Sequence, residues 1–529
     1  MIQIKKQIIY QTFALALTMS LSSCFSDDST LGGDTVGEIT VSGIAVSYSN
    51  TAYMGEYLDI KPEVESSEEM TYSWLLLSDK TGSEDADGNE IQPEVIGTEK
   101  DLHYEVNIAP GTYQIRLEAK GKSGYTVYKK ASLTVRTTFS QGFYVLKENE
   151  EGNTDLDLIT LDGKTGNDIL TSLDGCALQG APMSMGPQYN AYYVNPDDDQ
   201  METANLLFVT TESGNFRVAR TTDLKSVFDR SNIMYDKMGD SEYPYLFFSA
   251  LYYSGMMTNE GIYSANSAAS SFLGASTGQY GMPVSKCGGS RYAFTDLDSS
   301  GGGVFWDGKN HNLMTYDYNL TADALRKSDM SGEEITQNLT DYDCMACGYN
   351  KLSNGATGVI VLRNNVTSKR YLYFTEGASQ GITLSARKQI REDSHAAKAS
   401  YYGLNGITAS YLYCVDAGHL YAMNFSDDDL GEVELKPQGI ASDETINFVS
   451  NQFWNPAFSS GELFDYLIVG TQKGDSYKLY FYEINGGAPQ GKPVMIMEGK
   501  GKVKCVRFVN TNYDSTDFQF GYLTFSTND

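Results

Sequence analysis

Few residues in this chain have the types and spacing of a catalytic or metal-binding site. Residues 344–347, Cys-Met-Ala-Cys, form one Cys-X-X-Cys pair without the second pair that a zinc site needs. Their surroundings have the pattern of strand and turn, not of the helix N-terminus that activates a redox cysteine, so structural thiols, either free or in a local disulfide, are expected. No His-Glu-X-X-His motif occurs, and the four histidines are widely spaced: His103, His311, His395 and His419. The sequence therefore predicts no catalytic residue, no metal, no cofactor and no enzymatic activity.

Carboxylates are the side chains from which a hydrolytic pair could still be assembled. Residues 298–301, Asp-Ser-Ser-Gly, precede Trp306 with the residue types of a sialidase Asp-box but with the wrong spacing. The acidic triplets 197–199 and 427–429 are typical of solvated loop tips, because a calcium site needs oxygen ligands from several loops. A glycan hydrolase that uses a carboxylate pair remains the alternative function.

Two tryptophans, Trp306 and Trp454, are candidate ligand-binding residues. Sugar rings and peptide groups pack against the faces of Trp and Tyr, and Trp454 lies close to Pro456 at the end of a strand-like run. Core packing is the alternative role for both, since most Trp side chains are largely buried. The tyrosines between residues 243 and 253 have the same two possibilities.

The first residues of the chain direct it to a membrane surface. Lys5 and Lys6 precede an apolar run over residues 8–21, the pattern of a secretory signal that is too short for a lasting membrane span. In residues 21–24, Leu-Ser-Ser-Cys, small residues admit a peptidase and the Cys24 thiol is the nucleophile that accepts a lipid. Residues 1–23 resemble a bacterial lipoprotein signal with Cys24 as the lipidated residue, and the acidic residues that follow resemble the surface-export signal of Bacteroidota lipoproteins. We therefore expect a lipid-anchored protein of the outer membrane that is exposed at the cell surface; an ordinary signal peptide with an incidental Cys24 is the alternative.

The composition excludes one class of partner. The formal net charge is −29, so nucleic acid and anionic membrane surfaces repel the chain. We predict no nucleic-acid partner, and membrane contact only through the N-terminal lipid. Aromatic residues make up 12% of the chain, with 38 Tyr, which favours strands and binding surfaces.

The elements that must position these residues are strands. Residues 24–36 are rich in Ser, Asp, Thr and Gly without periodicity, and predict a flexible tether. Residues 37–137 predict a small all-β domain of sandwich size with Trp74 as its core tryptophan. Within it, residues 110–119 alternate apolar and polar side chains and residues 121–124, Gly-Lys-Ser-Gly, form a turn, which together indicate a hairpin.

Residues 138–529 repeat a crude unit of two strands joined by a turn rich in Gly, Asn and Asp. Seven copies begin at residues 143, 206, 245, 303, 359, 411 and 466. Hairpin-like units cannot bury their own faces, and radial stacking around an axis solves this problem. We predict an all-β protein in which the domain of residues 37–137 is followed by a seven-bladed β-propeller over residues 138–529, with six and eight blades as alternatives. Residues 518–525 are expected to supply the strand that closes the ring.

One family combines these features. The Tyr-Ser-Trp strand at residues 72–74 and the hairpin of residues 110–124 resemble a PKD or immunoglobulin-like domain. Together with the lipoprotein signal and the propeller-like remainder, they resemble the PKD-like lipoproteins of Bacteroidota. The resemblance implies an accessory protein of SusC/SusD-type outer-membrane importers that captures a nutrient. We expect a non-catalytic lipoprotein that binds an oligosaccharide or peptide, docks on a SusC/SusD-type importer, or does both; a purely structural importer subunit is a further alternative.

Overall fold

The computed structural model describes most of the chain from Ile39 onwards. The described residues are 39–52, 57–78, 81–83, 89–106, 108, 111–137, 141–196, 198–249, 252–268, 274, 276–296, 302–316, 320, 326–327, 329–330, 338–352, 355–378, 381–455, 463–510, 522–523 and 527–528. The predicted signal, Cys24, the tether and the Asp-Ser-Ser-Gly segment before Trp306 lie outside them. No helix within the described ranges is long and apolar enough to cross a bilayer.

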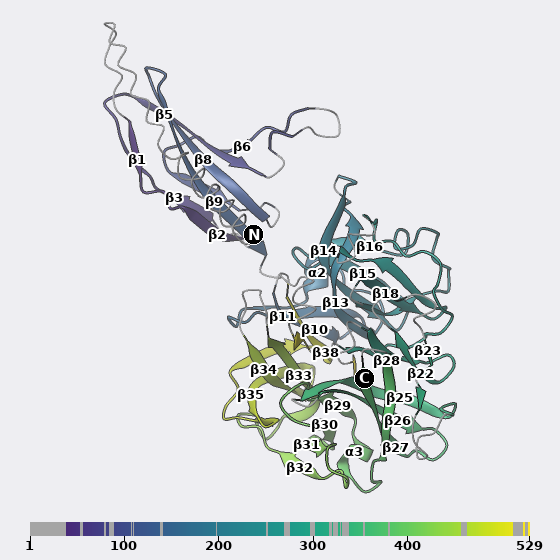
Figure 1. Ribbon diagram of the computed structural model, residues 1–529. Coiled ribbons are helices and arrows are strands. Elements are labelled where there is room, and N and C mark those ends of the chain that lie inside the picture. Colours follow the sequence, from purple (N-terminus) through teal and green to yellow (C-terminus); the bar gives the residue numbers. More distant parts are fainter. Residues whose placement is uncertain are drawn as a thin grey trace, which may run out of the picture.

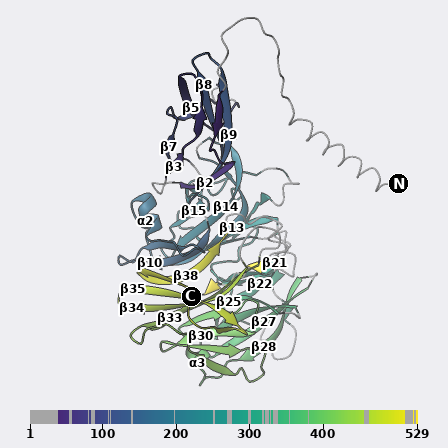
Figure 2. The ribbon, with the colours of Figure 1, turned by 90° about the vertical axis from the view of Figure 1, so that its left-hand side faces the viewer.

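The described elements are nearly all strands, which confirms the all-β class. Two short helices are α2 (Ile169–Asp174) and α3 (His395–Lys398). The strands gather in two groups, which Figure 1 and Figure 2 show as separate assemblies of ribbon. We call residues 39–137 the N-terminal region and residues 142–510 the body.

The N-terminal region contains one five-stranded sheet and two short strand pairs. The sheet has the order β2 (Ser47–Ala52), β9 (Thr126–Thr137), β8 (Gly111–Gly121), β5 (Met70–Leu77) and β6 (Glu94–Gly97). The pairs are β1 (Thr40–Ser42) with β4 (Glu63–Glu65) and β3 (Tyr57–Ile60) with β7 (Leu102–Glu105).

The core of the N-terminal region forms as the sequence predicts. Trp74 in β5 is 1% exposed, and its Nε1–H donates to the Glu99 carbonyl over 3.1 Å. The alternate residues Ile115, Leu117 and Ala119 of β8 are buried beside it. Strands β8 and β9 form the predicted hairpin, whose turn places Gly124 at φ +91°, a conformation that glycine adopts without a Cβ clash.

In the described part of the body, the strands form seven successive sheets. The first comprises β12 (Thr165–Gly166), β11 (Thr154–Ile159), β10 (Gly142–Glu148) and β38 (Lys502–Val509). The second comprises β13 (Pro182–Val194), β14 (Met201–Thr211), β15 (Phe216–Arg220) and β16 (Ser226–Phe228). The third comprises β17 (Pro244–Ser249), β18 (Tyr253–Thr258) and β19 (Ile262–Asn266), and the fourth β20 (Ala293–Asp296), β21 (Gly302–Asp307), β22 (Asn312–Tyr316) and β23 (Arg326–Lys327).

The remaining sheets use the second half of the body and two short strands after it. The fifth comprises β24 (Asp329–Met330), β28 (Gly381–Gln389), β27 (Arg370–Ala378), β26 (Gly355–Asn364), β25 (Tyr342–Leu352) and β40 (Thr527–Asn528). The sixth comprises β29 (Tyr401–Leu404), β30 (Tyr411–Asp416), β31 (His419–Asn424) and β32 (Glu432–Leu435). The seventh comprises β36 (Ala488–Pro489), β35 (Ser476–Asn485), β34 (Phe464–Lys473), β33 (Thr445–Asn455) and β39 (Tyr522–Leu523), with β37 (Met495–Lys500) also paired to β35.

Each of the seven predicted repeat units lies in a different sheet, but the predicted closing strand is wrong. The strand that joins the end of the body to its beginning is β38, which pairs antiparallel with β10 from Gly142 to Glu148. Within residues 518–525 the described strand is β39, and it pairs with β33 of the seventh sheet. The valines and phenylalanine of β38 pack on both of its faces, which favours it for this position over a later segment.

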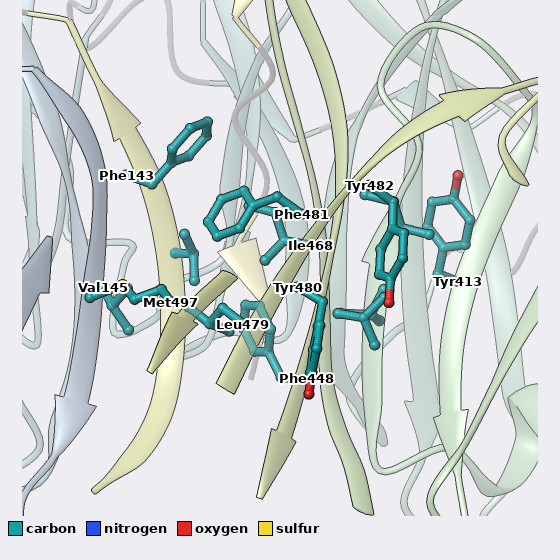
Figure 3. Packing of buried hydrophobic residues seen from close by; sticks show 14 of the residues in the cluster. Phe143, Val145, Tyr413, Phe448, Ile468, Leu479, Tyr480, Phe481, Tyr482 and Met497 are labelled. Atoms are coloured by element: carbon teal, nitrogen blue, oxygen red, sulfur yellow. The ribbon is translucent and has the colours of Figure 1, made fainter. Parts of the chain in front are cut away.

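Apolar side chains fill the spaces between successive sheets. Separate buried clusters join the first sheet to the second, the second to the third and fourth, the fourth to the fifth, and the fifth to the sixth. The largest joins the sixth and seventh sheets back to the first. Figure 3 shows this last cluster, in which Phe143 and Val145 of β10 lie with residues of the seventh sheet such as Phe481 and Met497.

Candidate functional site

The two candidate tryptophans lie in the core of the body. Trp306 in β21 is 4% exposed and belongs to the cluster between the fourth and fifth sheets. Trp454 in β33 is fully buried, with its ring centroid 6.5 Å from that of Phe508. A ring that the core covers presents no face to a sugar, so this burial favours the packing role over ligand binding for both.

Cys344 and Cys347 share one face of β25 because the strand contains a β-bulge. Cys344 and Ala346 pair with consecutive residues of β26, so Met345 between them has no partner in that strand. Both cysteines are buried between the fourth and fifth sheets, and neither forms a disulfide. Burial raises the pKa of the Cys344 thiol well above its ordinary value, so this thiol stays protonated and is a poor nucleophile.

Among the described residues, neither the histidines nor the acidic loops build a metal site. Each histidine has its own nearby partner: Asp59 for His103, the Tyr342 carbonyl for His311, Asp416 for His395 and Glu434 for His419. Residues 427–429 are exposed, and Asp197 of the other acidic triplet lies outside the described residues. Over the described ranges, no group of three or more His, Cys, Asp and Glu side chains could hold a metal ion.

Buried carboxylates in the body have structural partners. Asp157 is fully buried with its carboxylate 2.7 Å from the ammonium of Lys147, which is 1% exposed. The Tyr477 hydroxyl of the seventh sheet donates to the same carboxylate, so this buried pair ties that sheet to the first. Other buried carboxylates accept hydrogen bonds close by: Asp155 from the Leu170 amide, Glu242 from the Thr258 and Tyr263 hydroxyls, and Asp307 from the Gly288 amide.

A different group of side chains lies near the beginnings of strands from several sheets. Arg291 lies two residues before β20, and its guanidinium carbon lies 5.5 Å from the centroid of the Tyr292 ring. The charge of Arg291 acts on residues near the starts of four other strands: Tyr245 in β17, Cys344 in β25, Tyr401 in β29 and Cys505 in β38. Together with β20, these strands belong to five different sheets. Glu212, in the turn after β14 of the second sheet, also acts on Arg291.

Lys504 enters this group through a second β-bulge. Cys505 pairs with Leu146 of β10 and Val503 pairs with Lys147, so Lys504 between them has no partner in β10. A bulge redirects the side chain of the extra residue. The Tyr401 hydroxyl of the sixth sheet donates to the Lys504 carbonyl over 3.1 Å. This hydrogen bond holds the backbone of the bulge in place.

Tyr243 and Tyr245 form a stacked pair. The rings of Tyr243 and Tyr245 are stacked with centroids 5.2 Å apart, and their hydroxyl oxygens are 3.1 Å apart. The Ser184 hydroxyl of the second sheet donates to the Tyr245 carbonyl over 2.5 Å. The ring of Tyr243 lies over Gly214, where a Cβ would come within 3.0 Å of it. We call Glu212, Tyr243, Tyr245, Arg291, Tyr401 and Lys504 the Arg291 cluster.

Positive charge is concentrated in the Arg291 cluster although the chain is strongly acidic. Burial lowers the pKa of Arg291, and Glu212 opposes that shift. Burial, and then the charge of Arg291, lower the pKa of Lys504. Arg507, which is 7% exposed, adds a third cation that acts on Tyr401 and Cys505. Burial and the hydrogen bond with Tyr243 raise the pKa of Tyr245 to about 12, so its hydroxyl remains a neutral donor and acceptor.

This arrangement suits binding more than catalysis. Half-buried cations with neutral hydroxyls beside them can bind and orient an anionic group. The nearby thiols of Cys344 and Cys505 both have raised pKa values because they are buried, so neither supplies a thiolate nucleophile. Of this cluster, the sequence analysis singled out Tyr243 and Tyr245 only; Arg291 two residues before a strand and the basic start of β38 were the available signals.

Comparison with known proteins matches the first third of the chain to a family. The model of the PKD-like family matches residues 24–182, which include the whole N-terminal region and the first strands of the body. No curated protein matches the chain.

Solved structures give weak overall likenesses. A dihydro-heme d1 dehydrogenase, NirN, is 10% identical, with 72% of this chain and 76% of that chain covered at a TM-score of 0.37. A DUF4784 family protein from Bacteroides caccae is 8% identical, with 75% and 95% covered at 0.31. The SGBP-B protein of the mixed-linkage glucan utilization locus of Bacteroides ovatus, in complex with a heptasaccharide, is 11% identical, with 92% and 98% covered at 0.16. At these TM-scores the likenesses carry no argument about what this chain binds.

Proposed function

We propose that this protein is a lipid-anchored protein of the outer membrane, exposed at the cell surface, that binds a nutrient without transforming it. Its lipid is attached to Cys24, which follows the signal-type residues 1–23. Residues 24–36 serve as a tether that holds a PKD or immunoglobulin-like domain, residues 37–137, away from the membrane. The match of the PKD-like family model over residues 24–182 supports this assignment of the N-terminal part.

The body, in this proposal, is a seven-bladed propeller over residues 138–529. Two observations support it: the pairing of β38 with β10, and the apolar clusters that join each sheet to the next and the last sheets to the first. A closed ring of sheets buries both faces of every blade and leaves only short edges. It also gathers the innermost strand of each blade around one axis, which would bring the beginnings of strands from five sheets toward Arg291.

The Arg291 cluster is the observation that carries the binding role. It combines half-buried cations with stacked tyrosines at strand ends, whereas the buried carboxylates are engaged in the structural hydrogen bonds described above. Binding sites commonly combine apolar ring surface with a few convergent polar groups. The protein accordingly binds an oligosaccharide or a peptide and releases it unchanged.

The partner in this proposal is a SusC/SusD-type importer, which the resemblance of the chain to PKD-like lipoproteins implies. The experiment is to isolate the tagged full-length protein and its Cys24→Ser variant from gently solubilised envelopes. We expect lipid on Cys24 in the wild type, release of the variant from the membrane, and a SusC/SusD-type pair in the wild-type sample alone. Recovery of the wild type without lipid would contradict the anchor, and recovery with lipid but no importer protein would contradict the docking role.

A further inference from the structure

Tyr235, in the segment between the second and third sheets, carries the most exposed aromatic ring of the body. Among the described residues of the body it is the one exposed tyrosine, with 61% of its surface accessible. The other exposed tyrosines that the structure describes are Tyr57, Tyr125 and Tyr128 of the N-terminal region. Single exposed apolar side chains are common on protein surfaces, so the meaning of this ring depends on how it is held.

The backbone at Tyr235 is fixed to the core. Met234 and Tyr280 form a parallel β-bridge. The Tyr280 amide donates to the Ile233 carbonyl over 2.9 Å, and the Tyr235 amide donates to the Tyr280 carbonyl over 3.0 Å. Ile233 and Tyr280 are 0% and 2% exposed and belong to the apolar cluster of the second, third and fourth sheets. Tyr235 therefore faces solvent from a backbone that buried neighbours hold in place.

The Tyr235 ring is held along the adjacent segment, residues 277–281. Its hydroxyl oxygen accepts a hydrogen bond from the Thr277 hydroxyl over 3.0 Å. At the other end of the ring, a Cβ on Gly281 would come 3.9 Å from the Tyr235 Cδ2 atom. The ring thus meets the segment at both ends, and Gly281 has no side chain that would lift it. Since most of the residue is still accessible, one face of the ring is open to solvent.

The segment beneath the ring is itself packed on the second sheet. Gly278 has φ +76°, and a Cβ there would clash with the carbonyl oxygen of Tyr192 in β13. The Gln279 side chain donates from Nε2 to the Asn232 carbonyl over 2.8 Å. A ring that is already fixed on such a base loses little freedom when a ligand binds to it. We call Tyr235, Thr277, Gln279 and Gly281 the Tyr235 platform.

A flat open ring with a polar edge suits a sugar. The C–H groups on one face of a pyranose pack on an aromatic face, while its hydroxyl groups hydrogen-bond around the edge. The Tyr235 hydroxyl accepts from Thr277 and therefore keeps its own hydrogen for donation to a sugar oxygen. The platform thus offers both kinds of contact that a saccharide makes.

Size and charge favour a neutral saccharide over a protein or an acidic ligand. Among the described residues between 229 and 290, the exposed large apolar side chains are Tyr235 and Met282. Two side chains are far less than the roughly 800 Å² that each partner buries in a stable protein interface. The chain has a net charge of −29, and exposed Asp236 directly follows Tyr235, so an anionic ligand is repelled here.

We propose that the Tyr235 platform binds a neutral oligosaccharide, with one sugar ring packed on the open face of Tyr235 and hydrogen-bonded to its hydroxyl. The platform uses no residue of the Arg291 cluster. This inference therefore adds a binding site to the proposed function, and it depends neither on the lipid nor on an importer.

The test is calorimetric titration of the purified full-length protein with probes of equal length. The neutral probes are a β-linked oligoglucoside, an α-linked oligoglucoside and a β-linked oligomannoside, and the acidic probe is an oligogalacturonate. We expect at least one neutral probe to bind with an affinity that changes little with salt, because no charged group of the ligand takes part. An equal concentration of oligogalacturonate should not displace it.

Variants assign the binding to the platform. Tyr235→Ala removes the ring and should weaken the neutral probe by about tenfold or more. Tyr235→Phe keeps the ring and loses only the hydroxyl, so it should weaken binding less than Tyr235→Ala does. Tyr125→Ala is the matched control: it removes a 51% exposed ring from the N-terminal region and should leave the affinity unchanged. Circular dichroism of each variant checks that the fold is retained.

The failures are separable. Binding of no neutral probe, equal effects of Tyr235→Ala and Tyr125→Ala, or displacement of the neutral probe by oligogalacturonate would overturn the Tyr235 site. Each of these results leaves the proposed function standing if the protein retains another ligand or brings down an importer protein. The proposed function fails when the folded protein retains no saccharide or peptide and brings down no importer protein.

Discussion

The N-terminal region and the body use the same kind of element but bury it differently. In the N-terminal region β3 alternates exposed and buried residues from Tyr57 to Ile60. In the body every residue of β11 and of β21 is buried. A strand with one solvated face needs apolar residues at every second position only, whereas a strand covered on both faces must accommodate all of its side chains. These two strands of the body therefore lie in sheets that are covered on both sides there.

This difference shows that alternation in a sequence does not by itself reveal exposure. Residues 154–159, Thr-Asp-Leu-Asp-Leu-Ile, have the pattern of a half-exposed strand, yet Asp155 and Asp157 are as buried as the leucines. They are tolerated because each has partners, Asp155 at the start of α2 and Asp157 at Lys147 and Tyr477. The two aspartates of β11 are therefore held by hydrogen bonds and an ion pair in the core, whereas Asp59 of β3 in the N-terminal region faces water.

The largest difference between the two regions is expected for ion pairs. Asp157→Ala leaves the Lys147 ammonium buried with Asp168 as its remaining partner, and should destabilise the body by about 3 kcal/mol. Glu69→Ala removes the exposed partner of Lys122 in the N-terminal region and should change little. Denaturant unfolding with region-specific fluorescence reports both, since Trp74 lies in the N-terminal region and Trp306 and Trp454 lie in the body. Equal losses for the two variants would contradict the contrast.

Neighbouring positions on one strand test two-sided burial directly. Leu158→Ala and Ile159→Ala point into different clusters of the body, and each should cost about 2–5 kcal/mol. In β3, Leu58→Ala should cost a similar amount while Asp59→Ala costs far less, because Leu58 is 3% exposed and Asp59 faces water. The measurement is the free energy of unfolding of the four variants; a tolerant position in β11 would show that one face of that sheet is open.

Alanine substitutions at two glycines with similar φ angles distinguish backbone strain from steric crowding. Gly214 and Gly124 have φ of +85° and +91°, so alanine at either should cost about 1 kcal/mol of backbone strain. At Gly214 the new Cβ also meets the Tyr243 ring at 3.0 Å, whereas nothing lies within 4 Å at Gly124. Gly214→Ala should therefore lower the thermal midpoint of the body more than Gly124→Ala lowers that of the N-terminal region. Equal shifts would show that Tyr243 adapts freely.

The smallest expected effect is an acid sensitivity of the seventh sheet. Burial opposes ionisation of Glu444, but hydrogen bonds from Tyr480, Thr471 and Lys478 outweigh it and hold its pKa below the ordinary value of 4.5. Because the folded pKa is the lower one, Glu444 stabilises the fold above pH 4.5, and this contribution is lost as the pH falls through the folded pKa. The thermal midpoint of the body should fall less steeply below pH 4.5 in Glu444→Gln than in wild type, and parallel curves would refute this role.

The sequence predicts local features of both regions better than it predicts their assembly. Alternation in residues 110–119 and the glycines at 121 and 124 were sufficient for the β8–β9 hairpin, because a hairpin is determined by neighbouring residues. Each of the seven predicted repeat units corresponds to one sheet. Strand β13, whose sequence begins Pro-Met-Ser-Met-Gly-Pro without clear alternation, was not predicted. The grouping of the Arg291 cluster could not be predicted, since its residues come from parts of the chain that are distant in the sequence.

The most direct test of the central claim, that this is a binding protein, is to probe an array of neutral and acidic oligosaccharides and peptides with folded residues 25–529. The account predicts that a chemically related subset of oligosaccharides is retained intact and that Tyr235→Ala, unlike Tyr125→Ala, reduces this retention. Retention of no oligosaccharide or peptide, or release of shortened products from those retained, would contradict it.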